Sequence, residues 1–257
     1  MIVIYKQGEN RMNLSGKIAI VTGGSRGIGR AIATTLSKYG ASIVITYSKD
    51  EEGAKDTLDS IKKNGGYCLA QRFDVSSYGD CDKAVQSVID TFGKVDILIN
   101  NAGLSNIGLF IDADEVLWNR LIDVNIKGVF NMTKCVLNNM LKNGSGTILN
   151  ISSIWGVNGA SCESIYSATK GAINSFTKAL AKEMGANGIR VNAIAPGVIN
   201  TGMNSWLSSE EEEELTNSIP MGCFGAANDI GDLAAFLCSE KAKYINGQTI
   251  VVDGGLI

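Results

Sequence analysis

The chain has 257 residues, of which 45% are hydrophobic and 19% charged, and its formal net charge is −3. That length and composition suit one large globular domain, or at most two. The small negative charge gives no reason to expect nucleic acid or an anionic membrane as a partner. The sequence contains no histidine, which excludes a Ser-His-Asp triad and argues against a zinc site.

The six cysteines include no Cys-x-x-Cys pair. We therefore expect reduced, mostly buried thiols in a cytoplasmic protein that binds no metal. No apolar run reaches the ~18 residues of a membrane span, and the first residues are too short for a signal peptide. Residues 1–11 are expected to form an appended arm, and residues 12–257 a single domain.

Short apolar runs alternate with segments of helical spacing along the whole chain. This alternation, with glycines at the turns, predicts an α/β fold: a single-domain Rossmann-type, doubly wound parallel sheet of about seven strands with helices on both faces. The expected strands are 18–22, 42–47, 67–73, 95–99, 147–153, 190–195 and 249–253, and the expected helices 31–39, 51–64, 78–92, 115–141, 165–184 and 229–239, with an insertion over 201–220.

Ligands bind at the carboxyl ends of the strands in such a sheet, and this sequence places its distinctive residues there. Gly23, Gly27 and Gly29 stand between the first strand and the first helix. Glycines at this position let the backbone approach a pyrophosphate at the positive end of the helix. Later strands end at Asp74, Asn101, Gly103, Ser153, Pro196 and Gly197.

Tyr166 and Lys170 are four residues apart on an expected helix and therefore share one face. An ammonium ~5 Å from the phenol, at an effective dielectric of ~20, favours the phenolate by roughly 3 kcal/mol, about 2 pKa units. The tyrosine would then serve as a general acid or base near neutral pH. Ser153 is placed to hold a carbonyl oxygen next to that phenol. Because Tyr-x-x-x-Lys pairs are common by chance, the upstream motifs are what favour a catalytic role.

Taken together, these motifs resemble the short-chain dehydrogenase/reductase family over essentially all of residues 14–257. Their order and spacing make the resemblance highly specific. It rests on Thr22-Gly-Gly-Ser-Arg-Gly-Ile-Gly29, Asp74, Asn100-Asn-Ala-Gly103, Asn125, Ser153, Tyr166-x-x-x-Lys170 and Pro196-Gly197.

The resemblance implies an oxidoreductase that reduces a carbonyl group with a nicotinamide cofactor. Tyr166 is then the general acid, Lys170 lowers its pKa and binds the nicotinamide ribose, and Ser153 orients the substrate oxygen. Asn125 would hold a water that relays protons, although a purely structural amide is the alternative. The expected cofactor-binding residues are Gly23, Ser25, Arg26, Gly27, Ile28, Gly29, Tyr47, Ser48, Lys49, Asp74 and Val75 on the adenosine and phosphate side, Asn101 near the adenine-side ribose, and Ala102, Gly103, Tyr166, Lys170, Pro196, Gly197, Ile199 and Thr201.

The end of the second strand indicates which cofactor is used. Enzymes of this class that use NAD place an acidic residue there, on the ribose 2′-hydroxyl. Here the position is Tyr47, followed by Ser48 and Lys49, and Arg26 can reach the same corner. The missing acid and the nearby cations favour NADP(H), although Asp50 follows directly.

Within the family, the chain is most similar to 3-oxoacyl-[acyl-carrier-protein] reductases of fatty acid biosynthesis, which implies a homotetramer. Those enzymes dock their acidic carrier with two arginines, but Gly144 and Asn187 occupy these positions here. The segment from Ser152 to Glu163 instead resembles reductases of 5-aminopentanone-modified elongation factor P.

The substrate is therefore a ketone that is either a small molecule or linked to a carrier or another protein. A hydroxysteroid or other ketone reductase also fits. A non-catalytic NADP-binding sensor is a different class of answer, and it would be marked by loss of the tyrosine or the lysine. The expected substrate pocket contains Trp155, Cys162, Met203 and Trp206.

Overall fold

The structure is a computed structural model that describes residues 12–202 and 207–257. The expected arm over residues 1–11, together with Met203 and Trp206, lies outside the described residues. Seven parallel strands form one sheet in the order β3-β2-β1-β4-β5-β6-β7. The predicted doubly wound parallel sheet is confirmed. The strands are β1 (Ile18–Thr22), β2 (Ser42–Tyr47), β3 (Cys68–Arg72), β4 (Ile97–Asn100), β5 (Gly146–Ile151), β6 (Ile189–Pro196) and β7 (Thr249–Val252).

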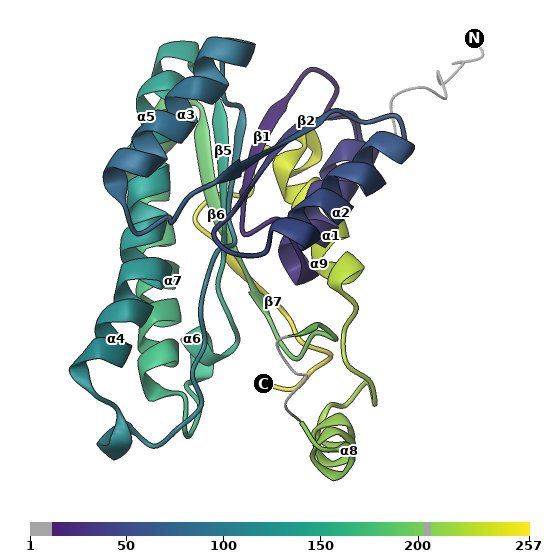
Figure 1. Ribbon diagram of the computed structural model, residues 1–257, viewed down its shortest axis with the longest axis vertical. Coiled ribbons are helices and arrows are strands. Elements are labelled where there is room, and N and C mark those ends of the chain that lie inside the picture. The colour runs from purple at the N-terminus through teal and green to yellow at the C-terminus, as the bar shows by residue number, and fades with distance from the viewer. Residues whose placement is uncertain (1–11, 203–206) are drawn as a thin grey trace, which may run out of the picture.

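Helices cover both faces of the sheet, as Figure 1 shows. On one side lie α1 (Gly27–Lys38), α2 (Glu51–Lys63) and α9 (Ala227–Cys238), and on the other α3 (Tyr78–Phe92), α5 (Gly128–Asn143) and α7 (Ser164–Met184). The remaining helices, α4 (Glu115–Ile122), α6 (Trp155–Asn158) and α8 (Ser209–Ser218), lie toward the end of the molecule that the strands point to. No helix in residues 12–202 or 207–257 is long and apolar enough to cross a membrane.

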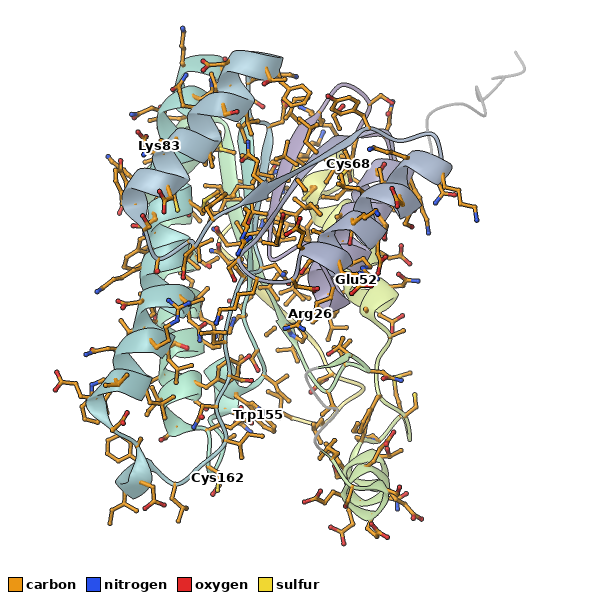
Figure 2. The ribbon with its side chains drawn as sticks, in the orientation of Figure 1. Arg26, Glu52, Cys68, Lys83, Trp155 and Cys162 are labelled. Atoms are coloured by element: carbon orange, nitrogen blue, oxygen red, sulfur yellow. The ribbon has the colours of Figure 1, made fainter. Side chains whose placement is uncertain are left out.

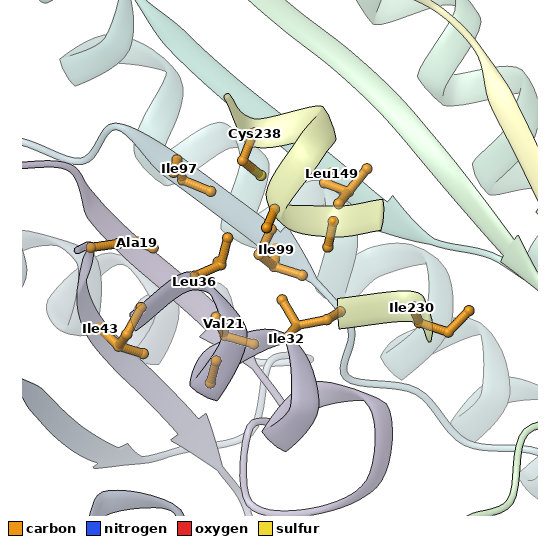
Figure 3. Packing of buried hydrophobic residues seen from close by; sticks show 14 of the residues in the cluster. Ala19, Val21, Ile32, Leu36, Ile43, Ile97, Ile99, Leu149, Ile230 and Cys238 are labelled. Carbon is orange, nitrogen blue, oxygen red and sulfur yellow. The ribbon is translucent and has the colours of Figure 1, made fainter. Parts of the chain in front are cut away.

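The strands are apolar throughout because each of their faces packs into a separate core. Successive side chains of a strand point to opposite faces. Ala19 and Val21 accordingly belong to the cluster beneath α1 and α9, part of which Figure 3 shows. Ile18 and Ile20 belong to the cluster beneath α3, α5 and α7. Because both faces of the sheet are buried, the edge formed by the carboxyl ends of the strands is the part left to line a site.

The expected continuous helix over residues 115–141 is interrupted in the structure. Between α4 and α5 lies a π-helical segment, Asp123–Lys127. Such segments are rare and occur often at functional sites. The side chain of Asn125, within this segment, binds the backbone of Leu104 and the hydroxyl of Thr169 on α7. A tertiary contact therefore overrides the regular helical pattern that the sequence suggests.

Several other expected boundaries shift by one to four residues. The first helix begins at Gly27 and not at Ala31, so the end of the glycine-rich stretch, Gly27 to Gly29, lies in the first helical turn. β5 ends at Ile151, which leaves Ser153 just beyond the strand, and the short helix α6 that follows was not predicted. The acidic run after Ser208 does start a helix, with Ser208 and Glu211 forming a capping box.

Candidate active site

The turn between β1 and α1, which we call the glycine loop (residues 23–29), requires glycine at several positions. Gly23 and Gly27 have positive φ angles of 64° and 55°, a region that favours glycine. A Cβ atom on Gly29 would overlap the carbonyl oxygen of Gly23, and one on Gly24 would lie 2.6 Å from Cγ2 of Ile45. The loop can therefore fold tightly under the start of α1 and leave the helix N-terminus accessible.

Two side chains that the sequence did not mark hold this loop in place. The Arg30 guanidinium donates hydrogen bonds to the carbonyl oxygens of Ser25, at 2.6 Å, and Gly53, at 2.9 Å. The Thr57 hydroxyl, on α2, lies 3.1 Å from the carbonyl oxygen of Gly24. Arg30 also reaches Gly53, and Thr57 reaches Gly24, both more than twenty residues away, so no local motif could have identified this bracing.

Asn101 supports the loop from the neighbouring strand. Its side-chain amide donates to the carbonyl oxygens of Thr22 and Gly23, at 2.9 and 3.0 Å. The hydroxyl of Thr22 in turn accepts the backbone N–H groups of Asn101 and Ala102, at 2.9 and 3.0 Å. The sequence placed Asn101 at a ribose. In the structure both amide hydrogens are engaged by the loop, so the residue positions the glycine loop through its side chain.

A cavity of about 760 Å³ runs along the carboxyl ends of the strands. The structure brings together along it every residue that the sequence assigned to the cofactor. These are Gly23, Ser25, Arg26, Gly27, Ile28, Gly29, Tyr47, Ser48, Lys49, Asp74, Val75, Asn101, Ala102, Gly103, Tyr166, Lys170, Pro196, Gly197, Ile199 and Thr201, and Ser153 and Arg120 also line it.

One end of this main cavity is rich in charge. The Arg26 side chain is 80% exposed and has only a loose ion pair, 3.9 Å, with Asp50. Figure 2 shows Arg26 next to the start of α1, toward the middle of the molecule. Asp74 accepts a hydrogen bond from Arg120 at 2.8 Å and two from Ser76. Although partial burial opposes it, these bonds hold the pKa of Asp74 below its ordinary value.

The other end of the main cavity holds Ser153, Tyr166 and Lys170. The Lys170 ammonium donates a 2.8 Å hydrogen bond to the carbonyl oxygen of Ile151 and lies 5.6 Å from the centroid of the Tyr166 ring. Gly156 lets α6 pack against this part of α7, since a Cβ there would lie 2.6 Å from the Lys170 backbone. A phenol, a hydroxyl and an ammonium thus converge in the same cavity that the glycine loop lines.

The protonation of this trio differs from the sequence-based expectation. Burial raises the pKa of Tyr166 to about 12, with a hydrogen bond from Ser153 opposing the shift and the charge of Glu163 adding to it. Burial also lowers the pKa of Lys170 to about 8. The expectation that the ammonium lowers the phenol pKa by about two units is therefore wrong for this structure. Removal from water disfavours both charged forms, and it outweighs the attraction between them.

Asn125 does not line the main cavity. Its amide oxygen accepts the backbone N–H of Leu104 at 2.8 Å, and its amide nitrogen donates to the carbonyl oxygen of Leu104 and the hydroxyl of Thr169. The amide therefore fixes the segment that follows β4, which includes Gly103 next to Lys170. These contacts agree with the structural alternative, and a water-relay role for Asn125 stays a prediction.

The expected substrate residues that the structure describes lie beside the main cavity and do not line it. Trp155 is half-buried in α6, and its backbone N–H donates to the Ser153 hydroxyl at 3.2 Å. Cys162 precedes α7 and has a φ of 63°, the one positive φ among the non-glycine residues that the structure describes. Figure 2 shows Trp155 near α6 and Cys162 farther out. Glu163, which follows Cys162 directly, was not marked by the sequence as a site residue.

The six cysteines are free thiols, of which Cys68, Cys81 and Cys238 are buried and Cys223 is exposed. Burial raises the pKa of Cys68, Cys81 and Cys238 to about 12. Their thiols are therefore protonated and unreactive at neutral pH. No cluster of metal-ligating side chains occurs in the part of the chain that the structure describes.

Comparison with known proteins agrees with this geometry. A family model described as enoyl-(acyl carrier protein) reductase matches residues 23–257. The 3-oxoacyl-[acyl-carrier-protein] reductase FabG of Staphylococcus aureus (strain Mu50) is 40% identical over 240 residues, which is 93% of this chain and 98% of the relative.

Two further proteins resemble this chain over nearly its whole length. The uncharacterized oxidoreductase YmfI of Bacillus subtilis (strain 168) is 38% identical over 240 residues, with 93% of this chain and 98% of the relative covered. A solved structure from Sinorhizobium meliloti 1021, assigned as a short-chain alcohol dehydrogenase, superimposes with a TM-score of 0.91 at 37% identity, covering 95% of this chain and 98% of that one.

Proposed function

Since this chain belongs to the short-chain dehydrogenase/reductase family and is an oxidoreductase, we propose that it uses NADPH to reduce a ketone to a secondary alcohol, with Tyr166 as the general acid. The observation that carries the proposal is the convergence of Ser153, Tyr166 and Lys170 at one end of the main cavity, which the glycine loop also lines. NADPH supplies the hydride, and the residues of the chain bind, orient and protonate.

The shape of the glycine loop suits a dinucleotide. Gly23, Gly27 and Gly29 remove the side chains that would fill the space in front of α1. The unpaired N–H groups and the dipole at a helix N-terminus favour a bound phosphate. The 760 Å³ main cavity continues from this loop to Tyr166, which is a size range typical of ligand sites.

The preference for NADPH rests on the corner formed by Arg26, Tyr47, Ser48 and Lys49. These four residues line the same end of the main cavity. Tyr47 replaces the acid that would bind a ribose 2′-hydroxyl and repel a phosphate there. Arg26 has only the 3.9 Å ion pair with Asp50, which leaves its guanidinium available for a bidentate contact with a 2′-phosphate.

The raised pKa of Tyr166 supports its role as a proton donor. With a pKa of about 12 the phenol is protonated throughout the neutral range. Ser153 bonds to the phenol, so a ketone oxygen can lie between the two hydroxyl groups. Lys170, held by the Ile151 carbonyl, presents its positive charge to the same region. As the ketone oxygen gains negative charge, these groups stabilise it and the phenol donates its proton.

These residues define the reaction more closely than they define the substrate. The similarity to FabG enzymes favours a 3-oxoacyl group linked to a carrier protein. The two carrier-docking positions, however, are Gly144, a left-handed helix cap, and Asn187. Arg190, a cation near these positions, is half-buried and hydrogen-bonded to Thr147 and the carbonyl oxygen of Ser239. It cannot reach a partner surface.

These missing cations favour a second candidate, a reductase of 5-aminopentanone-modified elongation factor P. The segment from Ser152 to Glu163 resembles such enzymes, and it forms the substrate side of the site. The non-catalytic alternative is disfavoured by the presence of both Tyr166 and Lys170 at the cavity. A homotetramer is also proposed, with α4, α5 and α7 as a pairing face. Its support is an exposed aromatic side chain on α5, Phe130, which packs on Phe176 of α7 at 4.7 Å.

The test is a panel of ketones with NADPH and NADH that includes a carrier-linked 3-oxoacyl substrate, an amino ketone and a hydroxysteroid ketone. We expect NADPH-dependent reduction of at least one ketone by the wild type and its loss in Tyr166→Phe. Tight NADPH binding without turnover of any substrate would favour the sensor and contradict the proposal.

A further inference from the structure

Arg120 lines the main cavity, yet the proposed reaction gives it no role. It lies on α4, and its guanidinium donates a 2.8 Å hydrogen bond to Oδ2 of Asp74. Asp74 stands two residues beyond the end of β3 and also lines the cavity. The two residues are 46 positions apart in the sequence. The contact therefore joins α4 to the carboxyl end of an edge strand, at the wall of the site.

The strand order indicates which part of a dinucleotide would lie at this wall. The sheet runs β3-β2-β1-β4-β5-β6-β7, with the glycine loop after β1. Ser153 follows β5, on one side of that loop, whereas Tyr47 at the end of β2 and Asp74 after β3 lie on the other side. With the phosphates at the loop and the nicotinamide toward Ser153, the adenosine half must extend toward β2 and β3. Its base then lies near Asp74.

The Asp74 carboxylate is held by most of its hydrogen-bonding sites. Oδ1 accepts the backbone N–H and the hydroxyl of Ser76, at 3.0 and 2.8 Å, and Oδ2 accepts Arg120. Each carboxylate oxygen has two lone pairs, so these bonds leave one acceptor site on Oδ2. Burial alone would raise the pKa of Asp74, but the bonds from Ser76 and Arg120 bring it below its ordinary value. The group is therefore ionised at neutral pH and can only accept.

The backbone of the Asp74 turn is fixed independently of Arg120. Asn131, on α5, donates to the carbonyl oxygens of Val75 and Ser76, at 2.9 and 3.2 Å. A Cβ atom on Gly128, also on α5, would lie 2.6 Å from Cγ2 of Val75, so the turn packs closely on this helix. A change at Arg120 should therefore affect the orientation and charge of the carboxylate and leave the turn in place.

We propose that Arg120 is a positioning residue for the cofactor, which acts through Asp74 to make this end of the main cavity specific for a base that presents an amino group, as adenine does. The remaining site on Oδ2 would accept that amino group. A base with a carbonyl oxygen at the same position would bring an acceptor against a fixed carboxylate, and the site would reject it. This inference rests on the proposed use of NADPH and deepens it.

The test compares the binding of NADPH with that of its hypoxanthine analogue, in which a carbonyl oxygen replaces the 6-amino group of adenine. Nicotinamide fluorescence gives both dissociation constants without any ketone. We expect the wild type to bind NADPH about tenfold or more tightly than the analogue. Arg120→Met should reduce this preference to about threefold or less, and Arg120→Lys, which keeps a cation, should retain most of it. In turnover, Arg120→Met should raise the KM for NADPH by a larger factor than it lowers kcat.

A double-mutant cycle tests whether Arg120 acts through Asp74. Asp74→Asn removes the charge and keeps the shape of the side chain, and it should itself lower the preference for NADPH. Arg120→Met added to Asp74→Asn should then cause little further change, because the group on which Arg120 acts is already lost. Independent, additive losses would show that Arg120 contacts the nucleotide by another route and would overturn the inference.

Lys127→Met is the matched control. It removes a 2.7 Å ion pair between Lys127 and Asp123, in the segment that follows α4, and neither residue lines the main cavity. This variant should keep the preference of the wild type.

Equal binding of NADPH and the analogue by the wild type, or an unchanged preference in Arg120→Met, would overturn the inference, whereas NADPH-dependent ketone reduction would still support the proposed function. If Arg120→Met does not fold, an unchanged preference in Asp74→Asn would overturn the inference equally. A wild type that binds neither nucleotide would contradict both proposals.

Discussion

The two sides of the main cavity are built differently. On the side of β1, α1 and β4, buried or half-buried side chains hold the backbone. Arg30, Thr57 and Asn101 donate to carbonyl oxygens of the glycine loop, and the Thr22 hydroxyl accepts backbone N–H groups that follow β4. On the side of α6, the start of α7 and residues 104–113, large apolar groups such as Phe110 and Ile111 are 62% and 87% exposed.

This difference separates two tasks. We call the side of β1, α1 and β4 the braced side. It must hold the dinucleotide cofactor in a single geometry, and its preorganised backbone suits that task. The substrate side carries large apolar groups that the chain leaves exposed, such as Phe110 and Ile111. We therefore expect substitutions on the braced side to affect cofactor binding and folding, and those on the substrate side to affect the choice of substrate.

Tyr166→Phe should have the largest effect. The change removes the proton donor and leaves the ring, so kcat should fall by roughly 10³-fold while NADPH binding stays nearly intact. Steady-state kinetics and NADPH titration by fluorescence measure the two quantities. Turnover above a few per cent of the wild-type value would show that another group supplies the proton.

Gly29→Ala tests the braced side. The added methyl group would overlap the Gly23 carbonyl oxygen, and such overpacking costs about 1–3 kcal/mol. We expect a melting temperature lower by several degrees and a loss of NADPH affinity. Gly79→Ala, in the first turn of α3 where a Cβ meets nothing within 4 Å, is the control and should be neutral or slightly stabilising. Similar losses in both variants would mean that the loop has no special steric demand.

Much of the braced side could be predicted from the sequence, because its glycines, strands and helix starts are local patterns. The ends of the strands shifted by one or two residues, but the edge that they share was correct. The supporting residues could not be predicted, since Arg30 binds the carbonyl of Gly53 and Thr57 that of Gly24, which only the folded chain brings near. The same holds for the π-helical segment around Asn125, which depends on the backbone of Leu104.

The protonation of the site also escaped sequence reasoning. The spacing of Tyr166 and Lys170 is correct for one helix face, but the spacing carries no information on burial. Burial decides both pKa values, raising that of Tyr166 and lowering that of Lys170. Glu163 was hidden for the same reason, because a glutamate before a helix is usually an exposed residue that suits the helix dipole.

Tyr47→Asp should have a smaller effect, confined to cofactor choice. A carboxylate at the end of β2 would accept hydrogen bonds from a ribose 2′-hydroxyl and repel a 2′-phosphate. We expect the ratio of kcat/KM for NADPH to that for NADH to fall by about tenfold or more, which corresponds to ~1.4 kcal/mol. Tyr47→Phe serves as the control and should keep the preference. A wild type that uses NADPH and NADH equally would remove the basis of this prediction.

Carrier docking should show the smallest effect. Each lost rim contact weakens docking by ~1 kcal/mol, so two missing arginines imply roughly tenfold to thirtyfold weaker docking. A carrier-linked 3-oxoacyl substrate should therefore gain little over its free thioester analogue, and its rate should depend only weakly on salt. Gly144→Arg combined with Asn187→Arg should increase the carrier advantage. If the wild type reduces the carrier-linked substrate much faster than the free thioester, and high salt abolishes this advantage, the result would favour the carrier-linked 3-oxoacyl substrate.

The most direct test of the proposed reaction follows the transferred hydrogen. The purified chain is incubated with the amino ketone and NADPH that carries deuterium at the transferable position of its nicotinamide, and the product is analysed by mass spectrometry. We predict a secondary alcohol with one deuterium on the carbinol carbon, formed by the wild type and not by Tyr166→Phe. An alcohol without deuterium, or equal product from both proteins, would contradict hydride transfer coupled to proton donation by Tyr166.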